Sequence, residues 1–242
     1  MKLEKSVAFV TGANRGIGGA LVAQLLGRGV ARVYAAARDL GQAERMVELD
    51  PARVVPVRLD VTSPEQIAAA AKRAPDVTVL FNNAGLLGAF GLLDTPPANL
   101  QREFDTNFFG SLAVTRALLP ALERATGGAA IVNLLTVVSF ASMPAIGGYS
   151  ASKAAAFSMT QALRAELRKK HVDVHAVFPG PVDTEMSRNI QLPKTSADAV
   201  ARAIVEGVER GDEDILPDPM SMAVFAKWMA SPKELERQFG SM

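Results

Sequence analysis

The sequence predicts an α/β fold: a single, doubly wound parallel sheet with helices on both faces. Strand-like and helix-like segments alternate from end to end of the 242-residue chain. The strand-like segments are almost continuously apolar, which is typical of strands buried on both faces of a parallel sheet. No repeat, low-complexity tract or linker divides the chain, so residues 1–242 are expected to form one domain.

The elements are expected to follow in a regular order. The expected strands are short apolar runs at residues 7–10, 32–37, 54–59, 77–81, 130–134, 172–178 and 214–216. Helical spacing of apolar residues predicts helices that end near 29, cover 40–49, begin at 63, and cover 97–123, 149–169 and 198–210. Asp39 is suited to be a helix N-cap. Ser63, Pro64 and Gln66 fit an N-cap, a first helical position and the third position of a capping box.

The composition argues against several classes of function. The net charge of +1 gives no electrostatic reason to expect a nucleic-acid partner. The lack of cysteine excludes disulfides, thiolate chemistry and cysteine-based metal sites. His171 and His175 flank a strand-like segment, where they need not share a face, so no metal site is predicted. No apolar run is long enough for a signal peptide or a membrane span, so a soluble, cytoplasmic protein without membrane contact is expected.

A glycine-rich segment separates the first strand from the first helix. It reads Thr11-Gly12-Ala13-Asn14-Arg15-Gly16-Ile17-Gly18. Glycines let the backbone turn sharply and approach a pyrophosphate, and the following helix N-terminus offers free N–H groups and a positive dipole end. The context of strand, turn and helix therefore predicts a dinucleotide-binding loop. The alternative is a tight turn with purely structural glycines.

The distinctive segments all follow strands. The glycine loop follows strand one, residues 82–85 follow strand four, Thr136 follows strand five, and residues 179–181 follow strand six. In an open parallel sheet, ligands bind at the carboxyl ends of the strands, where strand order reverses. The sequence therefore predicts one ligand site along a single edge of the sheet.

Tyr149 and Lys153 are four positions apart, so on a helix both side chains project from one face. A phenol has a reference pKa of about 10, and a neighbouring ammonium favours the phenolate. A tyrosine poised near neutrality can donate and accept the proton that carbonyl reduction or alcohol oxidation requires. A shift of about 3 units corresponds to about 4 kcal/mol, which requires the pair to be partly buried. The alternative is an ordinary pair on a solvated helix face.

With these motifs the chain resembles the short-chain dehydrogenase/reductase family over essentially its full length. The resemblance rests on Thr11-Gly12-x3-Gly16-x-Gly18, Asp60, residues 82–85 (Asn-Asn-Ala-Gly), Asn107, Tyr149-x3-Lys153, and Pro179-Gly180-x-Val182-x-Thr184. It implies a Rossmann-type sheet of about seven strands that binds NAD or NADP. It also implies an oxidoreductase of the carbonyl or keto reductase type.

The resemblance implies four catalytic residues: Asn107, Thr136, Tyr149 and Lys153. Tyr149 would be the general acid, Lys153 would lower its pKa and bind the nicotinamide ribose, and Asn107 would hold a water in the proton relay. The family has serine thirteen positions before the tyrosine, where this chain has Thr136. Threonine keeps the hydroxyl but adds a methyl group and a stiffer side-chain torsion. Ser139 is the rival hydroxyl.

The resemblance also implies the cofactor site. Its residues are Gly12, Asn14, Arg15, Gly16, Ile17, Gly18, Arg38, Asp60, Val61, Asn83, Ala84, Gly85, Tyr149, Lys153, Pro179, Gly180, Val182 and Thr184. An acid at the end of strand two would select NAD, but Ala37 stands there. Arg38 and Arg15 can converge on a 2′-phosphate with forked hydrogen bonds, so NADP(H) is expected over NAD(H).

The expected substrate loops, about residues 86–96 and 181–196 together with 137–146, are largely apolar. They contribute Leu86, Leu87, Phe90, Phe140, Met143, Ile146, Met186, Ile190 and Leu192. An apolar pocket with one polar anchor suits an uncharged ketone or aldehyde. The alternative is a 3-oxoacyl-[acyl-carrier-protein] reductase, which needs a basic mouth, yet Arg188 and Lys194 form no patch. A non-catalytic dinucleotide-sensing regulator is the remote alternative.

The helices at 97–123 and 149–169 carry more apolar faces than one sheet contact can bury. In the family these helices form the dimer interface, so a homodimer or homotetramer is expected. The tail has no assigned role. It contains Met222, Phe225, Trp228 and Met229, which either cover the site or contact a neighbouring subunit.

Overall fold

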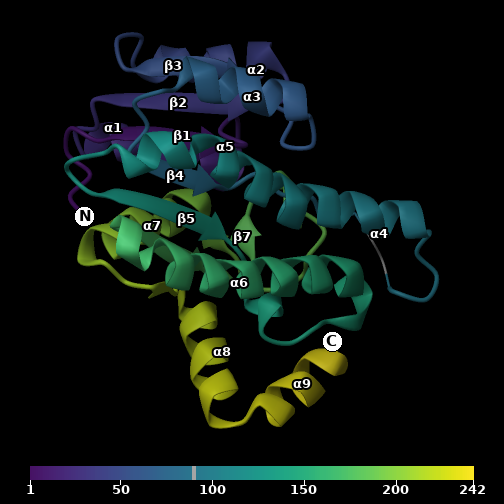
Figure 1. The fold of residues 1–242 in the computed structure, drawn as a ribbon. Helices are drawn as coiled ribbons and strands as arrows, with labels where there is room; N and C mark the ends of the chain where they lie inside the picture. The colour runs from purple at the N-terminus through teal and green to yellow at the C-terminus, as the bar shows by residue number, and fades with distance from the viewer. Residues whose placement is uncertain (89–90) are drawn as a thin grey trace.

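The computed structural model describes residues 1–88 and 91–242. Its central element is a seven-stranded sheet in which every neighbouring pair is parallel, with the order β3-β2-β1-β4-β5-β6-β9 (Figure 1). The strands are β1 (Val7–Thr11), β2 (Arg32–Ala37), β3 (Val54–Arg58), β4 (Val79–Asn82), β5 (Ala129–Leu134), β6 (Val172–Val177) and β9 (Asp214–Ile215). The predicted fold class is confirmed. Strand order reverses between β1 and β4, where a doubly wound sheet binds its ligand.

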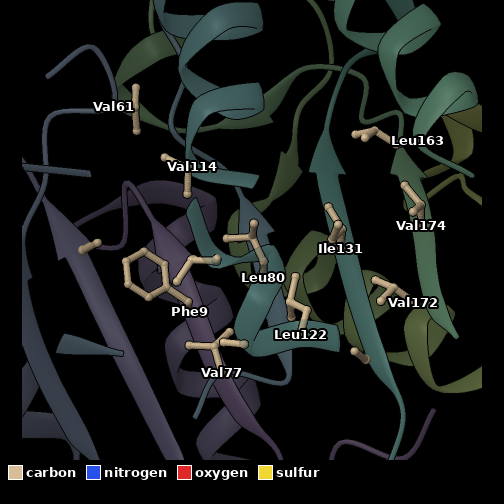
Figure 2. Close-up of a cluster of buried hydrophobic side chains, with 14 of the residues drawn as sticks. Phe9, Val61, Val77, Leu80, Val114, Leu122, Ile131, Leu163, Val172 and Val174 are labelled. Carbon is tan, nitrogen blue, oxygen red and sulfur yellow. The ribbon is translucent and has the colours of Figure 1, made fainter. Parts of the chain in front are cut away.

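Successive residues of each strand point to opposite faces, so the sheet builds two cores. Phe9, Leu80 and Ile131 face the helices α3 (Pro64–Arg73), α5 (Ser111–Glu123) and α6 (Gly147–Leu167), as Figure 2 shows in part. Ala8 and Val10 face the opposite core, which includes α1 (Gly16–Gly27) and α7 (Ala197–Arg210). Helices therefore cover both faces, as predicted.

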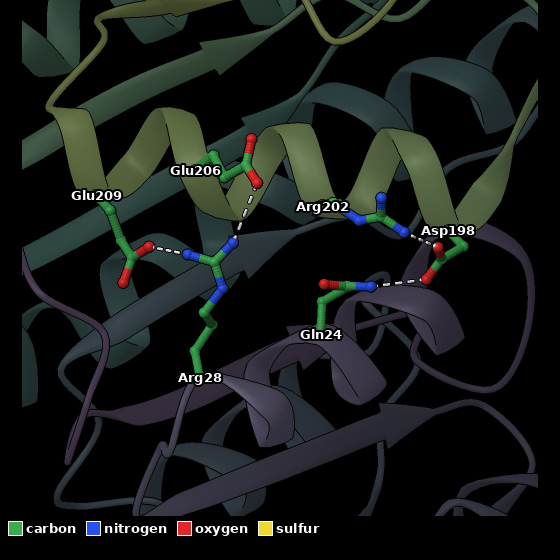
Figure 3. A network of polar contacts seen from close by, with 6 residues as sticks. All are labelled: Gln24, Arg28, Asp198, Arg202, Glu206 and Glu209. Carbon is green, nitrogen blue, oxygen red and sulfur yellow. Dashed lines mark hydrogen bonds and ion pairs between the residues drawn. The ribbon is translucent and has the colours of Figure 1, made fainter.

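Polar contacts join α1 and α7 along the protein surface (Figure 3). Arg28 pairs with Glu206 and Glu209, and the Gln24 amide donates to Asp198 at 2.7 Å. Such partly exposed pairs contribute little stability individually. They fix the register of the two helices over the buried cluster beneath them.

The helix expected over 97–123 contains an irregular turn. It runs as α4 (Pro97–Phe104), a π-helical segment (Asp105–Gly110) and α5. Gly110 is required there, because a Cβ at this position would lie 2.8 Å from a methyl carbon of Val61. π segments within α-helices are frequent at functional sites. This one carries Asn107, which is 1% exposed.

Three local predictions differ from the structure. α6 begins at Gly147 rather than at residue 149, and the helix over 40–49 is α2 (Leu40–Glu44) followed by a 3-10 segment (Arg45–Leu49). Ser63 caps α3 as predicted, but the capping box is incomplete. The Ser63 N–H already donates to the Asp60 carbonyl at 3.0 Å, so the Gln66 side chain accepts from the Asp60 N–H at 2.8 Å instead.

The C-terminal tail forms a hairpin of two helices, α8 (Pro219–Ala230) and α9 (Pro232–Gly240). In Figure 1 it extends from the sheet on the side of α6. Val224, Leu235 and Phe239 are buried against Val137 and Val138, which follow β5. The tail therefore packs on its own chain, directly behind the substrate-side loops.

The remaining sequence expectations concern histidines and membrane spans. His175 is buried, its Nδ1 lies 2.6 Å from the Asp212 carbonyl, and burial lowers its pKa. His171 ends the helical segment after α6 with a left-handed φ of 55°. Neither belongs to a metal-ligand group within residues 1–88 and 91–242. No helix in this same part of the chain is long and apolar enough to cross a bilayer.

Candidate active site

A cavity of about 950 Å³ lies at the carboxyl ends of β1, β4, β5 and β6. Its lining includes the glycine loop, residues 83–87, residues 134–138, Tyr149, Lys153 and residues 179–182. The prediction that these segments meet at one edge of the sheet is therefore confirmed. Arg38 also lines the cavity, as do Ile190 and Leu192, so one space joins the glycine loop to the substrate loops.

The glycine loop has the shape that a dinucleotide requires. Gly12 and Gly16 adopt left-handed φ values of 63° and 55°, which side chains disfavour. A Cβ on Gly18 would lie only 2.1 Å from the Gly12 carbonyl oxygen. The start of α1 therefore stands close to the loop and leaves backbone N–H groups for a pyrophosphate. The residues present fit the phosphates of a dinucleotide cofactor.

The end of β4 is tied to the glycine loop. The Asn83 side-chain amide donates to the carbonyls of Thr11 and Gly12 at 2.8 and 3.0 Å. The Thr11 hydroxyl accepts from the N–H groups of Asn83 and Ala84, both at 2.9 Å. These bonds fix the two strand ends across the point where strand order reverses.

Tyr149 and Lys153 lie one turn apart on α6 and both face the cavity. The Lys153 ammonium nitrogen is 5.9 Å from the centre of the Tyr149 ring. Lys153 is 5% exposed and donates to the Leu134 carbonyl at 2.7 Å. Burial lowers the pKa of Lys153 to about 8. The expected burial of the pair is present, and the surface interpretation of these two residues is excluded.

The pKa of Tyr149 differs from the sequence-based expectation. It lies above the usual value of a phenol, because burial disfavours the phenolate and the carboxylate of Glu103 opposes it further. The ammonium of Lys153 alone does not reverse this. The pKa of Tyr149 in the protein alone is therefore raised, and the predicted effect of Lys153 on it stays a prediction.

Asn107 links the substrate loop to α6. Its Oδ1 accepts from the Leu86 N–H at 2.8 Å, and its Nδ2 donates to the Leu86 carbonyl and to the Ser152 hydroxyl, each at 2.9 Å. Ser152 in turn donates to the Tyr149 carbonyl at 2.8 Å. Gly85 lies next to both Asn107 and Lys153, since a Cβ at this position would be 3.4 Å from Asn107 Oδ1 and 3.6 Å from Lys153 Nζ.

The structure separates the two candidate hydroxyls. Thr136 lines the same cavity as Tyr149, and its Oγ1 accepts from the Val138 N–H at a long distance of 3.4 Å. Ser139 is 8% exposed and is not part of the cavity lining. The geometry favours Thr136 as the hydroxyl that a substrate would meet.

The predicted phosphate-binding arginines are arranged unequally. Arg38 lines the cavity and, within the described part of the chain, has no hydrogen-bond or ion-pair partner. Arg15 also lines the cavity, but it pairs with Glu185 of the 181–196 loop. Asp39 caps α2 by accepting from the Gln42 N–H at 3.0 Å, as predicted. Its carboxylate is therefore bound to its own helix, which argues against a role in selecting NAD over NADP.

The remaining predicted cofactor contacts lie on the same cavity. Asp60 lines it, with one carboxylate oxygen accepting from the N–H and the hydroxyl of Thr62, and Val61 is buried beside it. Val182 begins the short strand β7 (Val182–Asp183), which pairs with β8 (Thr195–Ser196). Thr184 caps the next turn and lies against Gly16. The other predicted cofactor residues in the lining are Asn14, Ile17, Pro179 and Gly180.

Most predicted substrate-loop residues line the cavity: Leu86, Leu87, Met143, Ile146, Met186, Ile190 and Leu192. Phe140 does not. Its ring centre lies 4.7 Å from that of Trp228 in α8, in a stacked arrangement, and 4.4 Å from that of Phe178, so the ring packs between the tail and the end of β6. Phe90 lies outside the described residues.

Three residues of the site were not anticipated. Asp218, which is 3% exposed and caps α8, accepts from the Gly180 N–H at 2.9 Å and so fixes the turn after β6. Met220 packs on Gly180 and lines the cavity. Glu103 is fully buried on α4 and accepts from the Gly88 N–H at 3.0 Å. The Asp218-Pro219 pair was a local N-cap signal, but its contact with Gly180 is long-range.

Comparison with known proteins agrees with this geometry. Residues 6–195 match the family model described as short chain dehydrogenase. A 1-deoxy-11-beta-hydroxypentalenate dehydrogenase from Streptomyces exfoliatus is 33% identical over 202 residues, covering 80% of this chain and 74% of the relative. An uncharacterized oxidoreductase from Myxococcus xanthus is 33% identical over 240 residues, covering 93% of each chain.

Two solved structures share the fold over nearly the whole chain. A short chain dehydrogenase from Burkholderia cenocepacia J2315, in complex with NADP, is 40% identical with a TM-score of 0.92 and covers 99% of both chains. A short chain dehydrogenase/reductase from Burkholderia phymatum, in complex with NAD, is 28% identical with a TM-score of 0.87 and covers 98% of this chain and 96% of that one. The chain described here therefore belongs to the short-chain dehydrogenase/reductase family of oxidoreductases, with that family's Rossmann-type fold.

Proposed function

We propose that this protein is an NADP(H)-dependent oxidoreductase that reversibly reduces an apolar ketone or aldehyde to the alcohol. One observation carries the proposal. A single cavity holds a phosphate cradle of glycines at one end, and Thr136, Tyr149 and Lys153 beside an apolar chamber at the other. Bound there, the nicotinamide would supply or accept the hydride, which no side chain can do.

The protein's own residues would position the substrate and handle the proton. Thr136 donates a hydrogen bond to the substrate oxygen, and Tyr149 gives that oxygen its proton during reduction. Lys153 holds the nicotinamide ribose and, with Asn107, the proton relay behind the tyrosine. The raised pKa of Tyr149 keeps the phenol protonated at neutral pH, which is the form that reduction consumes.

The cofactor preference rests on the adenosine end of the cavity. Ala37 ends β2 without a carboxylate, and Arg38, whose guanidinium has no partner among residues 1–88 and 91–242, lines the cavity immediately after it. A guanidinium in this place favours a 2′-phosphate. The relative from Burkholderia cenocepacia, which is 40% identical, binds NADP, and this similarity supports the same choice. Arg15 would bind the same 2′-phosphate as Arg38 after exchanging its present partner, Glu185, for the phosphate.

The substrate class rests on the chamber lining. Leu86, Leu87, Met143, Ile146 and Ile190 surround the position that Tyr149 and Thr136 face. A 3-oxoacyl-[acyl-carrier-protein] reductase remains the second candidate for the same chemistry. It is less favoured, because the 181–196 loop carries only two basic residues, Arg188 and Lys194, and the Lys194 ammonium donates to the Arg188 carbonyl at 3.3 Å.

We also propose that the chain assembles into a homodimer or homotetramer through α4, α5 and α6. Phe109 is 52% exposed on the π-helical segment between α4 and α5, where an isolated subunit would leave an aromatic ring in water. Multi-angle light scattering would measure the mass, and Phe109→Asp should lower it.

Replacing Tyr149 tests the proposal. Tyr149→Phe keeps the ring in its packing but removes the hydroxyl, so turnover of a ketone and aldehyde panel with NADPH should be lost while NADPH binding is unchanged. Cofactor consumption and fluorescence titration of NADPH measure the two quantities. A Tyr149→Phe enzyme that still turns over would overturn the acid assignment. A wild-type protein that binds NADPH but turns over no substrate in the panel would favour the non-catalytic regulator.

A further inference from the structure

The substrate loop is held along one face of the helix α4 and its π-helical continuation. Asn107 binds Leu86 with two hydrogen bonds, as described above. Glu103, one helical turn earlier on the same face, accepts from the N–H of Gly88 at 3.0 Å. Two side chains one turn apart thus bind two alternate residues of the loop. Leu86 and Leu87, which this arrangement fixes, form one wall of the substrate chamber.

Glu103 is unusual in where its carboxylate lies. The side chain is 0% exposed, whereas α4 otherwise buries no residue. Burying a carboxyl group has a substantial free-energy cost unless the group makes specific contacts. The hydrogen bond from Gly88 is one such contact. α4 also packs against α6, which carries Tyr149, and the Glu103 carboxylate raises the pKa of Tyr149 by disfavouring its phenolate.

We propose that Glu103 is a positioning residue of this active site, which holds the substrate loop at Gly88 and places a carboxylate near the phenol of Tyr149. The inference rests on the proposed function, in which Tyr149 handles the proton. In this proposal Glu103 has two separable effects. The hydrogen bond shapes the chamber wall, and the negative charge favours the protonated phenol, which serves reduction and opposes alcohol oxidation.

Other charges near the site do not replace that of Glu103. The charged side chains that line the same cavity as Tyr149 are Arg15, Arg38, Asp60, Arg102, Asp105, Lys153 and Glu185. Only burial and Glu103 account for the raised pKa of Tyr149. Substituting Glu103 therefore isolates the proposed charge effect.

The chain allows a direct measurement, because it contains only two tyrosines, Tyr34 and Tyr149. In a Tyr34→Phe background, the near-ultraviolet absorbance of tyrosinate reports Tyr149 alone. The titration is run with saturating NADP⁺, with and without Glu103→Gln. The glutamine keeps an oxygen that accepts from Gly88 but removes the charge. The midpoint should move to lower pH, raising the phenolate fraction at a fixed pH below it by about three- to tenfold.

The loop effect has its own readout. Glu103→Leu removes the acceptor, so amide hydrogen exchange of segment 86–96 should accelerate by about tenfold or more, while Glu103→Gln leaves it near the wild-type rate. Glu166→Gln, on the exposed side of α6, is the matched control and should change neither quantity. The pH profile of alcohol oxidation should shift in parallel with the absorbance titration.

Each outcome decides one part of the inference. An unchanged or higher titration midpoint in Glu103→Gln removes the charge effect. Unchanged exchange in a folded Glu103→Leu removes the loop effect, and if that variant does not fold, Glu103→Ala in the same exchange experiment decides it. Both readouts are independent of turnover, so they remain valid if Tyr149→Phe contradicts the proposed function. Conversely, an active enzyme that requires Tyr149 but shows neither effect would refute only this inference.

Discussion

Gly18 provides the sharpest test of the cofactor cradle. A Cβ at this position would lie 2.1 Å from the Gly12 carbonyl oxygen and 2.5 Å from the Asn83 amide nitrogen, whereas real Cβ atoms essentially never approach closer than 3.0 Å. In Gly18→Ala the loop and helix must therefore separate by about 1 Å, since the nearest atom belongs to backbone. Overpacking of this kind costs about 1–3 kcal/mol.

Gly19 is the matched control on the same helix. Its nearest neighbour would be the Ala13 carbonyl oxygen at 3.5 Å, an ordinary contact, and alanine favours a helix by about 1 kcal/mol over glycine. For a chain of this size each kcal/mol shifts the melting temperature by about 2–4 °C. Gly18→Ala should therefore melt roughly 2–12 °C lower and lose NADPH affinity, while Gly19→Ala should melt at or above wild type.

The assays are calorimetry with and without NADP⁺, and fluorescence titration of NADPH. The steric argument predicts opposite signs for two neighbouring substitutions of the same chemistry. A Gly18→Ala protein that melts like wild type and binds NADPH equally well would refute it. Equal destabilisation by Gly19→Ala would show that the helix, and not the contact with Gly12, is responsible.

Three further predictions concern the cavity. Thr136→Ser should keep turnover and Thr136→Ala should lose about a hundredfold in kcat, with Ser139→Ala unaffected; the reverse pattern would make Ser139 the substrate hydroxyl. Arg38→Asp should weaken NADPH binding at least about tenfold more than NADH binding, and equal effects would contradict the 2′-phosphate assignment. Burial lowers the Lys153 pKa from 10.5 to about 8, so the unfolded chain binds more protons between these pH values. Relative to Lys153→Met, the wild-type free energy of unfolding should rise by about 3 kcal/mol across that window in urea titrations, and a flat difference would refute the burial argument.

The features that the sequence predicted are those that leave a local signature. Apolar runs identified the seven strands, and glycines with Asn83 and Pro179 marked the strand ends that meet at the cavity. Parallel topology then brings separate strand ends to one edge, so local signals alone were sufficient to predict that these segments line one cavity. The same reasoning placed Asp39 as a cap, because an N-cap acts on its own helix.

The features that the sequence did not predict depend on contacts between distant segments. Glu103 lies on a helix that is otherwise exposed, and nothing in its neighbourhood distinguishes a buried acid from a solvated one. Its position one turn before Asn107 was the only available signal. Phe140 looked like a chamber residue because it lies in a substrate-side loop, but the packing of Trp228 from the tail decides its position. Contacts of this kind between distant segments leave no periodic pattern in the sequence.

The environment of Tyr149 and Lys153 changes the role that the pair can have. Burial raises the pKa of Tyr149 and lowers that of Lys153, so the protein alone favours the uncharged phenol. Under the proposed function, reduction starts from that phenol and needs no further adjustment. Oxidation needs the phenolate, which burial and Glu103 both oppose. A positive charge must therefore be brought into the site for oxidation, and the oxidised nicotinamide ring is the group that would carry it. Under the proposed function, the redox state of the cofactor would therefore change the pKa of Tyr149, and the charge effect that we propose for Glu103 would oppose the change that oxidation needs.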